Sequence, residues 1–452
     1  MINKIVLLVA LILVYVSRNS SAVWASVGFG LIGYVFSDWL IPRVGDSFIK
    51  IGLFGKDLSK PGKPIIPETI GAVTATVYIF TMLFCIPFIF YKDMVVTTSG
   101  GGHRDISITE NGTSNGSFFP HNKLSEFLSA VLCLQTTTMI GIADDLFDLR
   151  WRHKVFLPAI AAIPLLIVYY VDFGVTYVLV PNFLQKWVNG RTTVNLGSLY
   201  YVYMAAMSIF CPHSINILAG VNGLEVGESI VLGILAVFND ALYLLFGPEV
   251  SHESHKLSII IIAPFIGVSY ALWKWNRWPA KVFVGDTYCY FAGMVFAVVG
   301  ILGHFSKTML LIFVPQIINF LYSCPQLFHI VFCPRHRLPR FNEKDGLLYP
   351  STADLVENPP KKFFIPILKL LGSLNLIRLE YVDNGKKDTI KSCTNMTLIN
   401  LTLVWFGPMR EDKLCNKILM INFIIGIIAI LTRHLIGTLL FGTDNLRPIT
   451  AF

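Results

Sequence analysis

Long apolar runs separated by short polar stretches recur along this chain of 452 residues. An α-helix needs about 20 predominantly apolar residues to cross the hydrocarbon core of a bilayer. Runs of about this length predict spanning helices at 22–41, 68–91, 124–143, 155–172, 196–214, 226–246, 257–273, 287–303, 308–332 and 416–441. We therefore expect an all-α polytopic membrane protein with about ten transmembrane helices.

The same pattern divides the rest of the chain. Residues 1–21 form an apolar segment that could be signal-like or an extra anchor, and we favour a retained anchor. A nine-helix transmembrane core is predicted at 22–332, and the last helix with a lumenal tail at 416–452. Between them, 333–415 is polar and Pro-rich, and 374–382 alternates apolar and polar residues as a strand does. A small cytosolic α/β insertion is expected there.

Composition agrees with a membrane protein. Charged residues make up 14% of the chain and hydrophobic residues 54%, whereas a soluble protein carries about 25% charged residues. The net charge of +8 is compatible with a preference for anionic lipid or for an anionic substrate, and does not choose between them. The eight cysteines show no CxxC spacing and fall mostly in apolar helices, which indicates packing residues. A nucleic-acid partner is not expected.

Lysine and arginine gather in alternate loops. They are frequent after the first, third and seventh predicted helices and in 333–415. They are sparser at 92–123, 173–195, 247–256 and 304–307. The positive-inside rule therefore makes the first set cytosolic and the second lumenal.

Four glycosylation sequons fall on both sides of this division. Those at Asn111 and Asn115 suit a lumenal loop, although such short motifs often occur by chance. Those at Asn395 and Asn400 would be cytosolic, so we expect them to be unmodified.

Acidic residues end the third predicted helix. Asp144, Asp145 and Asp148 are followed at once by a basic run that includes Arg150 and Lys154. Ionised carboxylates at membrane depth are costly, so they are functional candidates. If the helix continues, Asp144 and Asp148 share one face, where oxygen ligands would suit Mg²⁺ or Mn²⁺. The alternative is a helix-end acid pair neutralised by Arg150 and Lys154.

Further polar clusters fall in the same set of loops. A basic, turn-rich loop at 55–64 precedes Glu68. The stretch 216–225 predicts a broken helix, in which Asn216 could offer an oxygen to a metal and Asn222 could bind a base or sugar. The alternatives are a positive-inside anchor and a structural kink.

Two more clusters complete the set. Asp286 stands at the cytosolic mouth of the eighth predicted helix. Arg335, Arg337 and Arg340 lie within six residues stiffened by Pro334 and Pro339, and the planar guanidinium suits diphosphate oxygens. A surface positive-inside run is the alternative for the arginines.

Together these clusters offer acids for a divalent cation, bases for phosphate and polar groups for a nucleotide or sugar. Phosphoryl transfer from a soluble nucleotide donor to a lipid phosphate uses all three. The chain lacks a Gly-x-x-x-x-Gly-Lys-Ser/Thr loop, so a P-loop ATPase is not supported. A transporter of nucleotide sugars is the competing hypothesis, but its polar residues should also line the lumenal half.

Six motifs carry a resemblance to a known family. They are Gly-Ile-Ala-Asp-Asp at 141–145, Arg-Trp-Arg-His-Lys at 150–154, Asn-Ile-Leu-Ala-Gly-Val-Asn-Gly-Leu-Glu at 216–225, Val-Phe-Val-Gly-Asp-Thr at 282–287, Cys-Pro-Arg-His-Arg at 333–337 and Asn-Met-Thr-Leu-Ile-Asn at 395–400. The chain resembles the eukaryotic branch of the polyprenyl-phosphate N-acetylhexosamine-1-phosphate transferase superfamily, which includes bacterial MraY. The longer 92–123 loop and the apolar start look like the yeast form.

The resemblance implies a ten-helix protein of the endoplasmic reticulum membrane, usually a homodimer, with its active site facing the cytosol. The implied reaction moves GlcNAc-1-phosphate from UDP-GlcNAc to dolichyl phosphate and releases UMP, as the first step of N-glycan precursor assembly. The membrane lipid and the next glycosyltransferase of the pathway are implied partners. An enzyme of the same superfamily with another sugar or acceptor is a further alternative.

The resemblance also implies residue roles. By this resemblance Mg²⁺ would be held by Asn216 and Asp286, and the phosphates would be contacted by Lys154 and Arg335. The N-acetyl sugar would be bound by His336 and Arg337, and Glu68 would lie beside nucleotide and sugar. The uridine would be framed by Leu58, Gly220, Asn222 and Phe283.

The acceptor side is assigned to Asp144 and Asp145. A lipid phosphate monoester has a second pKa of roughly 6–7, so it is largely ionised near neutral pH and needs no strong general base. We expect direct attack by its oxygen, with one of the two aspartates orienting the acceptor or removing a residual proton. A covalent aspartyl-phosphate route is less favoured.

Overall fold

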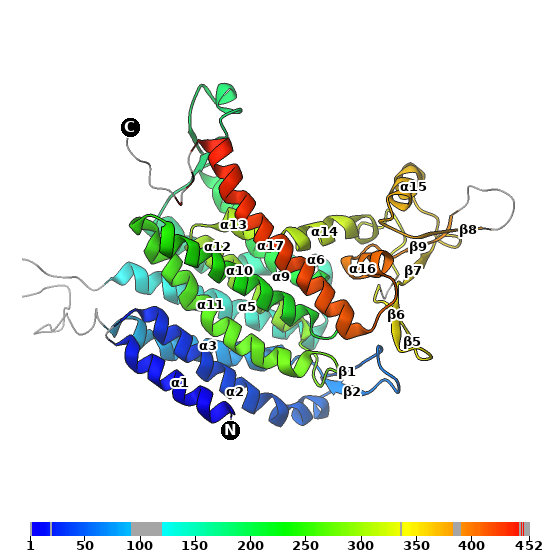
Figure 1. The fold of residues 1–452 in the computed structure, drawn as a ribbon, viewed down its shortest axis with the longest axis horizontal. Coiled ribbons are helices and arrows are strands. Elements are labelled where there is room, and N and C mark those ends of the chain that lie inside the picture. Colours follow the sequence, from blue (N-terminus) through cyan, green and yellow to red (C-terminus); the bar gives the residue numbers. More distant parts are fainter. Residues whose placement is uncertain are drawn as a thin grey trace, which may run out of the picture.

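The computed structural model describes residues 2–18, 20–91, 120–334, 337–382, 390–442, 444 and 446. Long helices lie side by side in a bundle, and small sheets project from one end of it (Figure 1). The long helices are α1 (Ile2–Ser17), α2 (Ala22–Lys50), α3 (Gly71–Ile89), α5 (His121–Phe147), α9 (Ser198–Ile217), α10 (Leu224–Phe246), α11 (Glu249–Asn276), α12 (Gly285–Leu302) and α17 (Glu411–Phe441).

The polytopic membrane class is confirmed. Among the described residues, eight segments are long and apolar enough to cross a membrane. One of them is the broken series α6 (Trp151–Lys154), α7 (Leu157–Ala161) and α8 (Ile163–Asp172). A ninth is formed if the bent pair α13 (Ser306–Ile312) and α14 (Val314–Leu327), at 65°, is one span. The fifth predicted segment, 196–214, forms α9, a 20-residue helix that includes several tyrosines.

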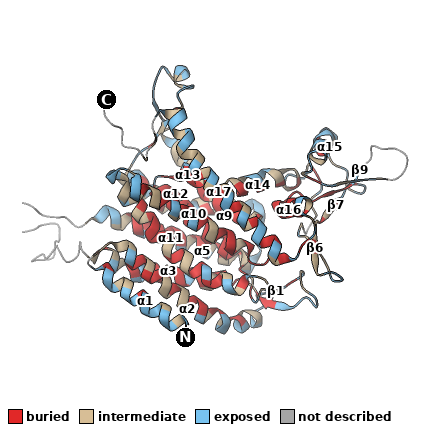
Figure 2. Ribbon diagram, in the orientation of Figure 1, coloured by how far each residue is buried: buried red, intermediate tan, exposed pale blue. Residues whose placement is uncertain are grey.

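Helix α12 lies at the centre of the bundle, in contact with α3, α5, α9 and α11. Figure 2 shows buried residues on these inner helices, whereas the outer face of α1 is exposed. Glycines let the neighbours approach closely. A Cβ on Gly141 of α5 would lie 2.6 Å from the Cα of Thr287, and one on Gly293 would lie 2.3 Å from the Cα of Pro212 in α9. These contacts fix how the starts of α12 and the ends of α5 and α9 meet.

The apolar N-terminal segment is helical. Helix α1 packs along α2, where a Cβ on Gly28 would lie 2.8 Å from the carbonyl oxygen of Ala10. The amide of Asn3 also donates a 3.0 Å hydrogen bond to Asp38 of α2. Helix α1 is shorter than the helices that could cross a membrane, and its role as a retained extra anchor stays a prediction.

The polar insertion contains short antiparallel sheets. Strands β5 (Arg340–Asn342) and β6 (Leu347–Tyr349) form a hairpin, and β7 (Thr352–Asp354), β9 (Ile390–Thr394) and β8 (Leu379–Tyr381) form a three-stranded sheet in that order. Two helices accompany them, α15 (Ile365–Ser373) and α16 (Leu398–Phe406), after the 3₁₀ turn η2 (Lys362–Phe364). The strand expected at 374–382 is therefore shorter, because Leu374 caps α15.

The sequons of the insertion are engaged inside it. Asn395 donates to Ser351 at 2.8 Å and accepts from Gln326 at 2.8 Å. Asn400 donates to the carbonyl of Arg337 at 2.9 Å. Because both side chains are buried and bonded, they are unsuited to carrying a glycan. Asn111 and Asn115 lie outside the described residues.

Two further hairpins occupy opposite ends of the bundle. Strands β3 (Tyr177–Leu179) and β4 (Thr193–Asn195), with the 3₁₀ turn η1 (Gln185–Val188), lie near the end of α17. The backbone N–H of Asn182 donates to the carbonyl of Leu440 at 2.8 Å there. Strands β1 (Phe54–Lys56) and β2 (Ile65–Pro67) lie at the other end, next to the site described below.

Candidate functional site

Three residues from distant parts of the chain form an acid–lysine cluster. The Nζ of Lys154 in α6 lies 2.7 Å from Oδ2 of Asp144 in α5 and 3.1 Å from Oδ2 of Asp286 in α12. The side chain of Asp144 is 1% exposed and that of Asp286 is 34% exposed. Asp286 is therefore the carboxylate of the pair that a ligand can reach.

The turn after α5 brings Lys154 back to the aspartates. Asp148 adopts a left-handed conformation with φ of 47°, and its N–H donates to the carbonyl of Asp144 at 2.9 Å. Oδ1 of Asp144 accepts from the N–H of Leu149 at 3.1 Å. The helix thus ends at Phe147, and Asp148 is exposed. Asp144 and Asp148 would share a helical face only if the helix continued, and it does not, because Asp148 closes it.

Asp145 holds the start of α12. Its Oδ1 accepts from the N–H of Asp286 at 2.7 Å, and its Oδ2 accepts from the N–H and Oγ of Thr287 at 3.2 and 2.6 Å. A carboxylate is favourable at a helix N-terminus, where backbone N–H groups lack partners. Gly285, at φ of 73°, makes room, because a Cβ there would lie 2.5 Å from Oδ2 of Asp145. Both oxygens of Asp145 are directed to the helix that carries Asp286.

A cavity of about 310 Å³ opens beside the cluster, and we call it the central cavity. It brings together seven residues that the sequence predicted for the site, namely Leu58, Glu68, Asn216, Gly220, Asn222, Phe283 and Asp286. Residues that the sequence did not assign also line it, among them Lys56, Asp57, Ser59, Glu225, Asn276, Leu338 and Glu411.

The β1–β2 hairpin fixes Phe283 in the wall of the central cavity. The N–H of Phe283 donates to the carbonyl of Pro67 at 2.8 Å, and its carbonyl accepts from Ile70 at 3.1 Å. Its ring covers Gly55, where a Cβ would lie 2.8 Å from the ring. Because Phe283 is only partly buried, one face of its ring can still meet a planar ligand.

Asn222 is held by a clamp of charged residues. Its backbone N–H donates to Glu411 at 2.9 Å, and its Nδ2 donates to Asp57 at 2.9 Å. Lys60 joins the two acids, with Nζ 2.6 Å from Glu411 and 3.2 Å from Asp57. The sequence offered no signal for this clamp beyond an acid in the first turn of a helix, because Glu411 lies 189 residues from Asn222 and 351 residues from Lys60.

The Gly220 turn is held in a similar way. Its N–H donates to Glu225 at 2.8 Å, and its φ is 116°. A Cβ at Gly220 would lie 2.1 Å from the side chain of Leu338. Glycine is therefore required where this turn meets the insertion.

Glu68 lies half-buried in the same cavity. Burial raises the pKa of its carboxyl above the ordinary value, and the carboxylates of Asp145 and Asp286 raise it further. Several acids thus share the site, with Lys154 as the cation that contacts two of them. Such an excess of carboxylates favours an added cation.

The residues present fit a magnesium ion. Asn216 and Asp286 line the same cavity, and the Asn216 side chain interacts with the Asp286 carboxylate. No cluster of three or more His, Cys, Asp or Glu with the geometry of a metal cage occurs in the described ranges. Mg²⁺ does not need such a cage, because it keeps several waters and binds through one or two protein oxygens together with substrate phosphates.

The predicted arginine motif is described in part. Arg335 and His336 lie outside the described residues. The carbonyl of Arg337 accepts from Asn400 at 2.9 Å and from Ser351 at 3.0 Å, which anchors this segment to the insertion. Its Nη1 is buried and has no hydrogen-bond partner in the described part of the chain.

Fold and site together define an integral membrane protein with an acid–lysine cluster and a cavity suited to a phosphorylated ligand. Residues 127–304, which contain the whole cluster, match the family described as glycosyl transferase family 4. A protein of Saccharomyces cerevisiae is 69% identical over 439 residues, which cover 97% of each chain. A protein of Schizosaccharomyces pombe is 49% identical, over 95% of this chain and 96% of the relative. A protein of Dictyostelium discoideum is 36% identical, over 87% of this chain and 84% of the relative.

All three relatives are named UDP-N-acetylglucosamine–dolichyl-phosphate N-acetylglucosaminephosphotransferase. The chain belongs to this family.

Proposed function

We propose that the chain transfers GlcNAc-1-phosphate from UDP-GlcNAc to dolichyl phosphate, giving GlcNAc-diphosphodolichol and UMP, as the first step of N-glycan precursor assembly. The observation that carries the proposal is the cluster of Asp144, Lys154 and Asp286 beside a cavity at one end of a membrane bundle. The name and near-complete coverage of the yeast relative specify the substrates.

In this reaction an oxygen of dolichyl phosphate attacks the β-phosphorus of UDP-GlcNAc. The bond from that phosphorus to the bridging oxygen breaks, and UMP leaves with the electron pair. Both reactants are anions, so positive charge must be held where they meet. We propose that Lys154, which is held between Asp144 and Asp286, supplies this charge.

We propose Mg²⁺ as the cofactor, held by Asp286 and Asn216. When bound, the ion would offset charge on the donor diphosphate. Asp145 is then a positioning residue, because it bonds the N–H groups of Asp286 and Thr287 and so sets where the Asp286 carboxylate lies.

The two acceptor-side aspartates are proposed to differ in role. Asp144 is proposed to orient Lys154 toward the acceptor phosphate, because its buried carboxylate bonds that lysine. Asp145 has both oxygens engaged with α12, which disfavours it as a nucleophile for a covalent intermediate.

For the donor, we propose that Phe283, Leu58, Gly220 and Asn222 frame the uridine. The donors of Asn222 are engaged by Asp57 and Glu411, so its amide oxygen is the atom left to accept from the uracil ring. Glu68 would lie beside nucleotide and sugar. Following the resemblance, Arg335 would contact phosphate, and His336 and Arg337 the N-acetyl sugar.

We also propose the endoplasmic reticulum membrane as the location, with the central cavity facing the cytosol. The lysine- and arginine-rich loops gather at that end of the predicted topology, which supports this orientation. A homodimer, and contact with the next glycosyltransferase of the pathway, are proposed from the resemblance.

A transporter should also carry polar residues in the half of the bundle away from the central cavity, and some buried polar residues lie at that distance along the helices. Asp240 of α10 and His255 of α11 are buried and joined at 2.7 Å, about 22 Å along α10 from Glu225. The expectation that polar clusters gather at one end was thus incomplete. Ser258 also donates to Asp240, so this pair is satisfied internally and links two helices.

The test uses purified full-length chain in vesicles with radiolabelled UDP-GlcNAc and dolichyl phosphate. We expect a lipid-soluble labelled product that EDTA abolishes, and much less product from UDP-GalNAc. Asp286→Ala should lose activity, and unchanged activity in this variant would remove the metal assignment. Uptake of label without lipid product would support transport and overturn the proposal.

A further inference from the structure

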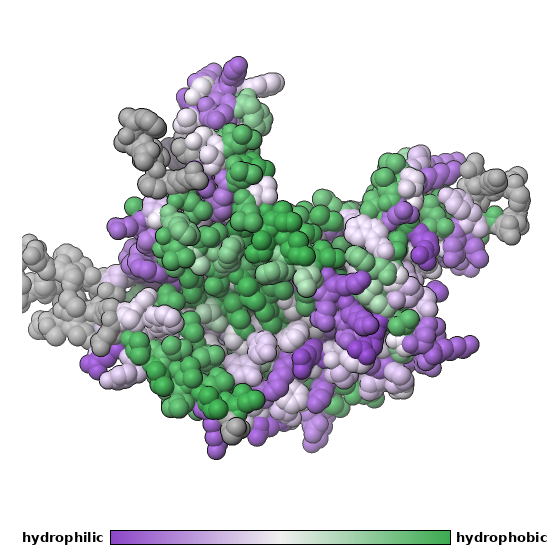
Figure 3. Space-filling view, in the orientation of Figure 1, coloured by the Kyte–Doolittle hydropathy of each residue, from purple (hydrophilic) through white to green (hydrophobic). Residues whose placement is uncertain are grey.

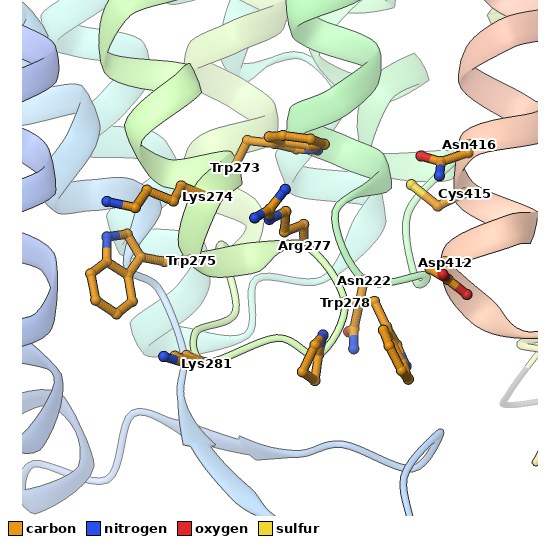
Figure 4. Close-up of a pocket in the computed structure, with 11 residues that line it drawn as sticks. Asn222, Trp273, Lys274, Trp275, Arg277, Trp278, Lys281, Asp412, Cys415 and Asn416 are labelled. Carbon is orange, nitrogen blue, oxygen red and sulfur yellow. The ribbon is translucent and has the colours of Figure 1, made fainter. Parts of the chain in front are cut away.

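A second cavity lies on the other side of the Asn222 turn. It has a volume of about 460 Å³ and is built from the end of α11, the loop before α12 and the start of α17 (Figure 4). Its lining is rich in cations and tryptophans, and we call it the cation–tryptophan cavity: Asn222, Trp273, Lys274, Trp275, Arg277, Trp278, Pro279, Lys281, Asp412, Cys415 and Asn416.

The tryptophans of this cavity each face a cation. Arg277 lies over the ring of Trp273 at 5.2 Å, and Lys281 lies over the ring of Trp275 at 5.1 Å. The ring of Trp278 is covered by Arg410 at 4.5 Å. These contacts hold the cations in place at the rim without neutralising them.

Two of the cations carry uncompensated charge. Lys274 is paired with Asp38 at 2.8 Å, and the acid of the lining, Asp412, is paired with Arg410 at 2.5 Å. Arg277 and Lys281 are exposed and have no ion-pair partner within the part of the chain that the structure describes. The cavity therefore has a net positive charge that suits an anion.

The surroundings show which anion fits. Figure 3 shows an apolar surface over α10, α11 and α17, with hydrophilic residues at the end of these helices nearest the β1–β2 hairpin. Exposed apolar side chains continue from the cavity along the helices, including Tyr270 of α11, Ile234 of α10 and Met420 of α17. Tryptophan and cationic residues at the boundary of an apolar surface are typical of the lipid headgroup region.

We propose that the cation–tryptophan cavity binds the phosphate headgroup of an anionic membrane phospholipid. Arg277 and Lys281 contact the phosphate, and the acyl chains follow the apolar surface of α10, α11 and α17.

Such a site is coupled to the central cavity by position. Asn222 lines both cavities. The adjacent Gly223 donates to Asn276 of the central cavity at 3.1 Å, and a Cβ on Gly223 would lie 3.0 Å from the Cα of Arg277. A phospholipid that orders Arg277 therefore orders the turn that carries Asn222.

The binding test measures thermal unfolding of the full-length chain in detergent. Dioctanoyl phosphatidic acid should raise Tm by roughly 2–4 °C more than dioctanoyl phosphatidylcholine does. Arg277→Gln combined with Lys281→Gln should lose this difference. The matched control, Arg43→Gln combined with Lys50→Gln, removes the same charge from the end of α2 and should keep it.

Three outcomes would overturn the site. One is an equal response in the two double variants, which would mean that total charge alone attracts the lipid. Another is the same shift with inorganic phosphate, which would mean a site for a free anion. The third is a smaller particle mass in the Arg277→Gln, Lys281→Gln variant, which would mean an interface between copies of the chain.

The coupling has its own test, which rests on the proposed transfer reaction. In nanodiscs with phosphatidic acid, KM for UDP-GlcNAc should be roughly threefold to tenfold lower than in phosphatidylcholine alone. The Arg277→Gln, Lys281→Gln variant should show equal KM in both, with its kcat in phosphatidylcholine unchanged. Equal KM for the wild type would overturn the coupling, whereas failure of the transferase proposal would leave the thermal shift intact.

Discussion

Asp145 offers the sharpest test of how the site is assembled. Asp145→Asn keeps one oxygen for the N–H of Asp286 but turns an amide donor toward the N–H and hydroxyl of Thr287. Each hydrogen bond to a charged group is worth about 1.5–3 kcal/mol; the bond from the Thr287 N–H is lost, and the other two no longer involve a charged partner. The start of α12 then loses the contacts that place Asp286.

We expect kcat to fall by about 100-fold or more, since each 1.4 kcal/mol corresponds to about tenfold. The concentration of Mg²⁺ that gives half-maximal activity should rise at the same time, because Asp286 no longer lies correctly. Thr287→Val, which removes the single 2.6 Å hydroxyl contact at constant size, should shift both quantities in the same direction by about tenfold or less. Thr287→Ser is the matched control that retains the hydroxyl.

The assay is labelled product formation against Mg²⁺ concentration at saturating dolichyl phosphate. If Asp145 acts through α12, the double variant should be less impaired than the sum of the single variants. A positioning role would be refuted if Asp145→Asn lowered kcat but left the half-maximal Mg²⁺ concentration unchanged, and Thr287→Val behaved like the wild type. That pattern would indicate a direct chemical role for Asp145.

Three further predictions address other parts of the site. Lys154→Gln leaves two facing carboxylates without their cation, so kcat/KM should fall at least about 100-fold, and a normal Lys154→Gln would exclude its phosphate role. Because the pKa of Glu68 is raised in the folded chain, its ionised carboxylate lowers the stability of the fold. Glu68→Gln should therefore raise Tm at neutral pH. This gain should vanish as the pH falls through the raised pKa toward the unfolded pKa of about 4.3. A Tm gain that persists in acid would contradict this. Gly293→Ala places a Cβ 2.3 Å from the Cα of Pro212, so unfolding in detergent should show a free energy of unfolding lower by about 1–3 kcal/mol. Transferase activity should also fall, because the α9–α12 contact is disturbed.

The membrane class and the approximate position of each helix follow from the sequence, because apolar length is a local property that the bilayer selects. Helix ends were less predictable. The aspartates illustrate this, since whether α5 continued past Phe147 depended on the left-handed conformation of Asp148.

The motifs also indicated which loops contain the site, and the central cavity contains seven of the predicted residues. Their partners were another matter. The clamp of Asp57, Lys60 and Glu411 around Asn222 joins segments about 350 residues apart, and no local pattern encodes such a contact.

What the amino-acid pattern specifies alone is therefore a helical membrane protein with acids, bases and amides gathered in one set of loops. The division of labour among the acids required the packed bundle. Close glycine contacts set α5 and α9 against α12, and that packing leaves Asp286 open to the cavity while turning Asp145 to the helix start. Hydrophobic length acts within one helix, whereas the role of a carboxylate depends on the neighbours that packing brings to it.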